Sequence, residues 1–164
     1  RFEDKMAIVR EMECKQQSAA AIAEHDDAGA AFGKGQGYFK LHMFEQAAVQ
    51  LEEAVATDPE HMPARMLLAM SRMHLQMWEE AQRHFQLIAA LTDDRRLQAI
   101  AYNALGCIQA VFAQLDQAQS YFRKAVASDP TYREPRINAE NCLRAPREGQ
   151  LQLQFGCAEL QALT

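Results

Sequence analysis

The sequence predicts an all-α protein built from antiparallel helix pairs stacked into a solenoid. Three observations carry this prediction. A set of residues recurs at a spacing of about 34 positions, which indicates an internal structural repeat. Small residues recur at fixed places within the repeat, where they let two helices approach closely. Asp58-Pro59 and Asp129-Pro130 mark helix ends, because the residue before proline is pushed out of the helical region.

The repeat occurs three times, starting at Ala28, Met62 and Ala99. The first two starts are 34 residues apart and the next two are 37 apart, so we expect the extra residues to extend the turn over 92–96. The predicted units are 28–61, 62–98 (degenerate, with the extended turn) and 99–132.

Position 8 of each unit is small, namely Gly35, Ala69 and Gly106. Positions 20 and 27 of the first and third units are alanine: Ala47, Ala54, Ala118 and Ala125. Large residues at neighbouring positions would fill the space between the helices. The second unit keeps Ala81 and Phe85 but has Asp93 where the other units have proline. Gly33 and Gly37 have no evident packing role and weaken their helix.

These residues resemble the tetratricopeptide repeat (TPR), whose pattern places small, aromatic and proline residues at the same offsets. The resemblance covers residues 28–132. It implies a TPR-type right-handed superhelical solenoid of antiparallel helix pairs, in which the first helix of each unit lines a concave surface. Helices are expected over 3–24, 28–41, 45–57, 62–76, 79–91, 96–113, 115–128 and 133–145.

Three segments flank the repeats. Residues 1–27 are expected to form an N-terminal helix that either caps the open end of the solenoid or is half of a decayed repeat. Residues 133–147 form a capping helix, or the first half of a truncated fourth repeat. Residues 148–164 form an amphipathic segment, with Leu151, Phe155, Ala158 and Ala162 at helical spacing. It could pack on its own repeats or on those of another molecule.

Composition excludes several classes of protein. The 164 residues are 49% hydrophobic, enough for one folded domain, and the longest apolar runs are too short to span a bilayer. A net charge of −5 argues against a nucleic-acid partner. Cys14, Cys107, Cys142 and Cys157 lack zinc-site spacing and suggest free thiols in a reducing compartment. The expected location is the cytoplasm, although the chain starts at Arg1 as if trimmed and a targeting signal could be missing.

No catalytic residues, metal ligands or cofactors are expected. Gly33-Lys34-Gly35-Gln36-Gly37 lacks the spacing of a phosphate-binding loop, and the five histidines are too far apart in sequence to share a helix face. Adjacent glutamates such as Glu52 and Glu53 point about 100° apart on a helix. Cys107 has no neighbouring histidine in sequence that would activate it.

The family resemblance places positions 2, 5, 9, 12 and 13 of each first helix in the concave groove. The resulting partner-binding candidates are Phe32, Gln36, Phe39, Lys40, Met66, Met70, Met73, His74, Asn103, Cys107, Val111, Asn141 and Arg144. Flexible methionine side chains suit an apolar helix or peptide. The alternative is that Met66, Met70 and Met73 form an ordinary buried stripe. Gln36, Asn103 and Asn141 are candidate anchors for a peptide backbone.

The predicted function is a non-enzymatic protein–protein interaction module, an adaptor or scaffold that captures an apolar or amphipathic segment in its groove. Family members that grip the acidic tail of a heat-shock chaperone use a charged and amide clamp. The matching positions here are Phe32, Gln36, Leu67, Ile100 and Ala104, so such a tail is not expected. One alternative is self-assembly through the C-terminal segment. Another, by architecture alone, is a bacterial type III secretion chaperone that shields a partner's apolar segment.

Overall fold

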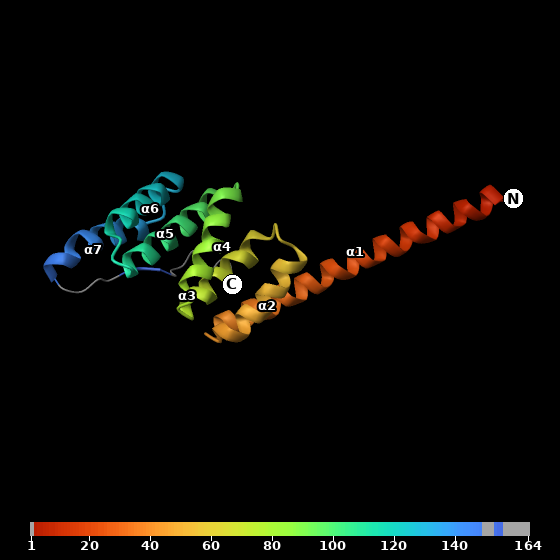
Figure 1. Ribbon diagram of the computed structural model, residues 1–164, viewed down its shortest axis with the longest axis horizontal. Coiled ribbons are helices and arrows are strands. Elements are labelled where there is room, and N and C mark those ends of the chain that lie inside the picture. Colours follow the sequence, from red (N-terminus) through yellow and green to blue (C-terminus); the bar gives the residue numbers. More distant parts are fainter. Residues whose placement is uncertain (1, 149–152, 156–164) are drawn as a thin grey trace.

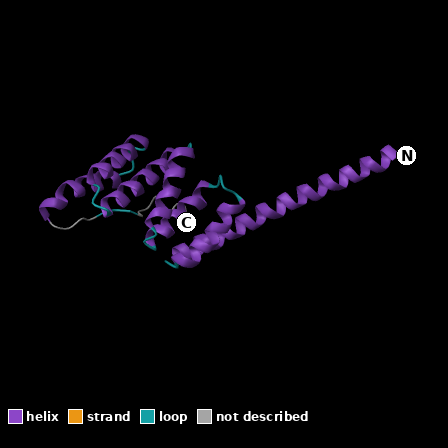
Figure 2. Cartoon of the chain, viewed as in Figure 1, coloured by secondary structure: helices purple, strands orange, loops and turns teal. Residues whose placement is uncertain are grey.

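A computed structural model describes residues 2–148 and 153–155, and every element in these ranges is a helix or a loop (Figures 1 and 2). The helices are α1 (Phe2–Lys40), α2 (Phe44–Thr57), α3 (Met62–His74), α4 (Trp78–Leu91), α5 (Arg95–Val111), α6 (Leu115–Ser128) and α7 (Glu134–Glu148). Successive helices pack against one another in order, giving the predicted all-α solenoid.

The first helix differs from the expectation. Two helices, over 3–24 and 28–41, were expected, but α1 runs unbroken from Phe2 to Lys40. Its N-terminal half projects away from the other helices (Figure 1), and the side chains over 6–20 are exposed. It therefore does not cap the solenoid in this structure. Helices readily continue where no proline interrupts them, and the segment between 24 and 28 contains none.

The turns inside the three helix pairs are alike. His42, Gln76 and Ala113 have φ of 58°, 59° and 58°, and each stands at position 15 of its predicted unit. In each turn the next residue donates its backbone N–H to a carbonyl five residues earlier, as in the bond of 2.9 Å from Met43 to Tyr38. This bond closes the end of the first helix. The repeat register read from the sequence is thus reproduced in the backbone.

The paired helices of the first and third units approach closely at position 8. A Cβ atom built on Gly35 would lie 2.6 Å from Leu51 of α2, and one on Gly106 would overlap the ring of Phe122 of α6. Both glycines are buried. By contrast, a Cβ on Gly33 or Gly37 would meet nothing within 4 Å. The packing role assigned to Gly35 is therefore confirmed.

The extra residues before the third unit were expected to extend a turn, and this expectation was wrong. Instead they form the first turn of α5, which begins at Arg95. Asp94 caps this turn, since its Oδ1 accepts hydrogen bonds from the backbone N–H groups of Arg96 (2.8 Å) and Leu97 (3.3 Å). An aspartate at this position stabilises a helix start, so the insertion lengthens the helix.

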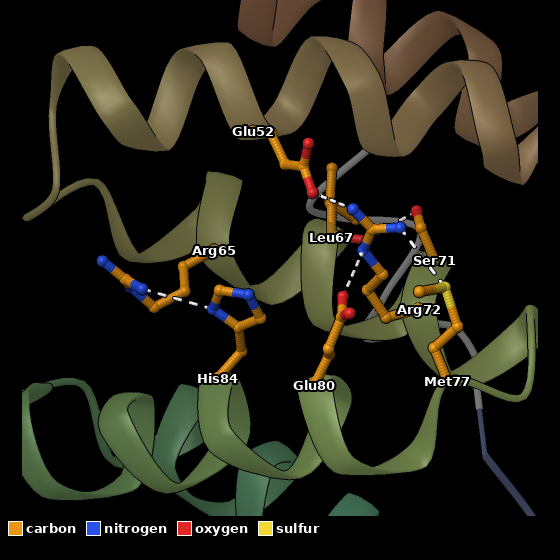
Figure 3. Close-up of polar contacts among 8 residues, drawn as sticks. All are labelled: Glu52, Arg65, Leu67, Ser71, Arg72, Met77, Glu80 and His84. Carbon is orange, nitrogen blue, oxygen red and sulfur yellow. Dashed lines mark hydrogen bonds and ion pairs between the residues drawn. The ribbon is translucent and has the colours of Figure 1, made fainter.

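Arg72 of α3 links three helices on one side of the stack (Figure 3). Its guanidinium forms ion pairs with Glu52 of α2 and with Glu80 of α4, the latter at 3.2 Å, and its side chain is only 15% exposed. Nearby, Arg65 lies 3.2 Å from Nδ1 of His84. Partial burial and the charge of Arg65 both lower the pKa of His84.

None of the helices in the described ranges is both long and apolar enough to cross a membrane.

Candidate functional site

Four of the predicted residues, Phe32, Gln36, Phe39 and Lys40, lie on α1. Phe32 and Phe39 are half-buried. Phe32 packs on the ring of His61 at 4.5 Å, and Phe39 meets Phe44 edge-on at 5.5 Å. Gln36 is half-buried and Lys40 is exposed. These side chains are positioned mainly by contacts with the neighbouring helices.

The methionines predicted to line an open groove are largely core. Met66 and Met70 are 0% and 1% exposed and belong to the main buried cluster, which corrects the expectation for both. The reason is that α3 lies between α2 and α4, so its apolar stripe is covered. Met73 is half-buried. His74 is exposed at the end of α3, where it stacks on Phe44 at 4.1 Å.

The residues predicted on α5 and α7 differ in how far they are buried. Cys107 is buried, at 4% exposed, so it is not an open groove residue. Val111 is 49% exposed at the end of α5. Asn141 is half-buried on α7. Arg144 is exposed and pairs with Glu140 one turn earlier at 3.9 Å.

Asn103, the remaining predicted residue, is fully buried within a polar network. Its Nδ2 lies 3.2 Å from the hydroxyl oxygen of Tyr132 and 3.5 Å from Oε2 of Glu134. The Tyr132 hydroxyl donates to that same Glu134 oxygen at 2.6 Å. Buried polar groups that are fully satisfied in this way hold a fixed orientation. Tyr132 and Glu134 therefore fix the orientation of the Asn103 carboxamide independently of any bound segment.

The turn before α7 brings Tyr132 and Glu134 into this network. Asp129 Oδ1 accepts hydrogen bonds from the backbone N–H of Thr131 (3.0 Å) and from its hydroxyl (2.6 Å). The hydroxyl bond is the main reason that the pKa of Asp129 is lowered. This side-chain turn, next to Pro130, directs the chain from α6 toward the first turn of α7.

Asn138 of α7 extends the network from Asn103 to Gln154 of the C-terminal segment. Its Nδ2 donates to Oδ1 of Asn103 at 2.9 Å and to the backbone carbonyl of Gln154 at 2.7 Å. Its Oδ1 accepts from the backbone N–H of Gln154 at 2.5 Å. Asn103 also approaches the Gln154 carbonyl, at 3.4 Å. Both polar backbone groups of Gln154 are thus held by asparagine, and we call Asn103 and Asn138 the asparagine clasp.

The residues on either side of Gln154 are apolar and half-buried. Leu153 packs against the cluster that contains Cys107, Phe122 and Cys142. Phe155 packs against this cluster and the main core, and its ring meets Phe85 edge-on at 6.2 Å. Residues 153–155 are not helical, although the predicted amphipathic segment has its apolar residues at helical spacing. Of the other residues in that expectation, Leu151, Ala158 and Ala162 lie outside the described residues, as does Cys157.

The chemistry available here is recognition by hydrogen bonding and apolar contact. Burial raises the pKa of the Cys107 thiol far above its ordinary value, so a thiolate nucleophile is disfavoured. Burial also raises the pKa of the Cys142 thiol. Among the described side chains, no group of three His, Cys, Asp or Glu residues could hold a metal ion.

Sequence reasoning missed Asn138, Tyr132 and the part played by Glu134. Asn138 stands at position 6 of the predicted segment 133–147, next to position 5, which was taken to face the groove. A usable signal was present, because Asn103 and Asn138 are 35 residues apart, close to one repeat length. Two asparagines at nearly equivalent places on successive first helices face the same surface.

A further hollow lies between α6 and α7, lined by Phe122, Arg123, Val126, Arg136, Ala139 and Glu140. It contains none of the predicted partner-binding residues.

The paired helices, the equivalent turns and the close contacts at position 8 define the chain as a helical-repeat solenoid. Residues 38–101 match the family model of the tetratricopeptide repeat. The comparison with curated proteins gives no match. Two solved structures share the fold. The first TPR domain of Spaghetti (RPAP3), bound to the HSP90 peptide SRMEEVD, is 19% identical with a TM-score of 0.65, covering 74% of this chain and 94% of that one. MamA is 18% identical with a TM-score of 0.64, covering 89% and 77%.

Proposed function

We propose that the protein is a non-enzymatic interaction module that holds an extended segment of a partner protein in its concave groove. The observation that carries the proposal is the asparagine clasp, in which Asn138 pairs with both backbone groups of Gln154. A side-chain carboxamide offers one donor and one acceptor side by side, which suits the N–H and C=O of one extended residue. The contact requires a peptide backbone but no particular side chain.

Affinity and selectivity would come from the apolar surfaces beside the clasp. In the structure these apolar surfaces are covered by Leu153 and Phe155, whose side chains pack against buried clusters. Burying apolar area contributes roughly 25 cal/mol for each Å², so a leucine and an aromatic ring can supply most of the binding energy. This supports an apolar or amphipathic partner segment, with the centre of the site moved from Met66 and Met70 to Asn103 and Asn138.

The RPAP3 domain binds an acidic HSP90 peptide. This chain has Phe32, Leu67 and Ile100 among the positions of the charged and amide clamp, and Leu67 and Ile100 are buried. Lysine or arginine would be needed there to pair with a terminal carboxylate. An apolar ligand is therefore favoured over an acidic one.

Self-association is the second candidate function, favoured by the same segment. A groove that accepts residues 153–155 of its own chain could also accept those of a second copy, and exchange of an identical element is a common route to dimers. Sedimentation of the purified chain distinguishes the two arrangements.

The proposal is tested by peptide selection. A phage-displayed library of random peptides is selected on the wild-type chain and on Gln154→Pro, whose tail lacks the clasped N–H. Enriched peptides are then titrated by fluorescence anisotropy against each chain, with and without Asn138→Asp. The matched control is Glu140→Ala, an exposed change on the same helix. We expect Asn138→Asp to weaken binding about ten-fold or more, because it loses the donor and buries a charge. Failure to enrich any peptide, or equal binding by Asn138→Asp and Glu140→Ala, would contradict the proposal.

A further inference from the structure

The groove already contains a ligand-like segment. Residues 153–155 run past α5 and α7, where Gln154 meets Asn103 and Asn138. In an extended chain, alternate side chains point to the same side. Leu153 and Phe155 both reach apolar clusters, whereas the Gln154 side chain between them is exposed.

This arrangement separates two sources of binding. The clasp contacts only the backbone of Gln154, so the middle residue can be of almost any type. Leu153 meets the cluster around Phe122, and Phe155 meets the ring of Phe85. These contacts favour, at three successive positions of a bound segment, an apolar residue, a residue of any type and an aromatic residue.

Two segments cannot use the clasp together. Oδ1 of Asn138 accepts from Gln154, and its Nδ2 is shared between Gln154 and Asn103. Both Nδ2 hydrogens of Asn138 are used in this way, so a second backbone would find no free donor there. Any partner using this site must therefore displace residues 153–155.

The tether strengthens this competition. Gln154 follows Asn138 by 16 residues in the same chain, so its effective concentration at the clasp is on the order of millimolar. A partner with the same contacts would have to overcome that local concentration.

We propose that Leu153–Phe155 is a resident competitor that occupies the groove in cis, and that the external ligand is an extended segment of the same apolar–any–aromatic pattern. This inference rests on the proposed function and adds its ligand class and its regulation. A partner binds when the tail is displaced, or when another contact draws the tail away.

The test uses the full-length chain and a change confined to the tail. Gln154→Pro removes the N–H that bonds to Asn138, while Gln154→Ala keeps it and removes only an exposed side chain. The probe is a labelled synthetic peptide with the sequence of residues 150–164 and serine in place of Cys157. Its affinity for wild type and both variants is measured by fluorescence anisotropy. Circular dichroism and sedimentation accompany each titration.

We expect Gln154→Pro to bind the probe about ten-fold more tightly than wild type or more, and Gln154→Ala to match wild type. In the probe itself, proline at the position of Gln154 should abolish binding, and alanine should not. Equal affinities for all three chains would overturn the inference. A wild-type dimer that Gln154→Pro converts to a monomer would also overturn it, because the tail would then act between molecules.

Failure of this inference is distinguishable from failure of the proposed function. If library-selected peptides bind all three chains equally and still depend on Asn138, the groove binds peptides and the tail does not compete. If neither these peptides nor the tail probe binds any chain, the proposed function itself is contradicted.

Discussion

Asn138 holds both backbone polar groups of Gln154, donating to its carbonyl at 2.7 Å and accepting from its N–H at 2.5 Å. The side chain that does this is 0% exposed and is itself fixed by Asn103. A buried amide with its donor and acceptor directed at a passing backbone is costly unless the backbone is present, because unpaired buried polar groups destabilise a fold. The pair thus connects the stability of the last helix with occupancy of the groove.

Replacing Tyr132 by phenylalanine tests the support behind the clasp. The change deletes the hydroxyl that accepts from Asn103 and donates to Glu134. We expect the free energy of unfolding to fall by about 1–3 kcal/mol, because two buried polar groups each lose a partner. Urea denaturation followed by circular dichroism measures it, with Tyr102→Phe as the half-buried control. If both variants unfold at the same urea concentration, the network does not support the fold.

Met70→Glu distinguishes core from groove. Met70 is 1% exposed, so a glutamate there would be buried without a partner. We expect loss of several kcal/mol of stability and a fall in helical circular dichroism. Met12→Glu, on the exposed part of α1, should leave the urea midpoint unchanged. A stable Met70→Glu chain that merely fails to bind peptides would restore Met70 to the open groove.

Replacing Gly33 and Gly35 by alanine should change the free energy of unfolding in opposite directions. Gly33→Ala should stabilise by about 0.5–1 kcal/mol, since alanine favours the helix and its Cβ meets open space. Gly35→Ala should destabilise by about 1–3 kcal/mol, because Leu51 must move. Thermal unfolding of the two variants compares them directly, and a shift of the same sign in both would contradict the close approach at position 8.

Stability should fall on mild acidification. The pKa values of the half-buried His84 and of His74, whose ring is covered on one face by Phe44, are lowered in the folded chain chiefly by desolvation, with Arg65 adding to the effect at His84. The unfolded chain therefore binds more protons between the folded pKa and 6.5. The neutral histidines stabilise the fold fully above 6.5, and this contribution is lost as the pH drops through the folded pKa.

Melting temperatures between about pH 7.5 and about pH 5.5 should accordingly decline. His84→Asn, which cannot titrate, should decline less than wild type. A melting temperature that is constant or rises over this range would contradict the assignment.

Much of the fold could be predicted because its determinants are local and recur. Gly35 and Gly106 marked the close helix contacts, and Asp58-Pro59 marked a helix end, each within one repeat. The continuity of α1 was missed because the repeat pattern places a unit boundary at residue 28, and only the surrounding structure decides whether a helix ends at such a boundary or continues through it. The extra residues before Leu97 were assigned to a turn because the repeat spacing shows their number but not their conformation. Asp94, which caps the first turn of α5, was not considered as a helix start.

The site was less predictable, for a physical reason. Family positions assign Met66 and Met70 to a surface, yet whether that surface is open depends on how the neighbouring helices pack. The spacing of Asn103 and Asn138 marks them as related positions, but their common partner, Gln154, is evident only from the way the chain after α7 returns to them.

The central claim is that the groove holds a peptide backbone through Asn103 and Asn138. Its most direct test is a nuclear magnetic resonance titration of isotope-labelled Gln154→Pro chain with the unlabelled peptide of residues 150–164, serine replacing Cys157. We predict that the side-chain carboxamide resonances of Asn103 and Asn138 shift together with backbone signals of α5 and α7. The claim is contradicted if those carboxamide signals stay in place while the hollow lined by Arg123 and Arg136 responds, or if no signal moves.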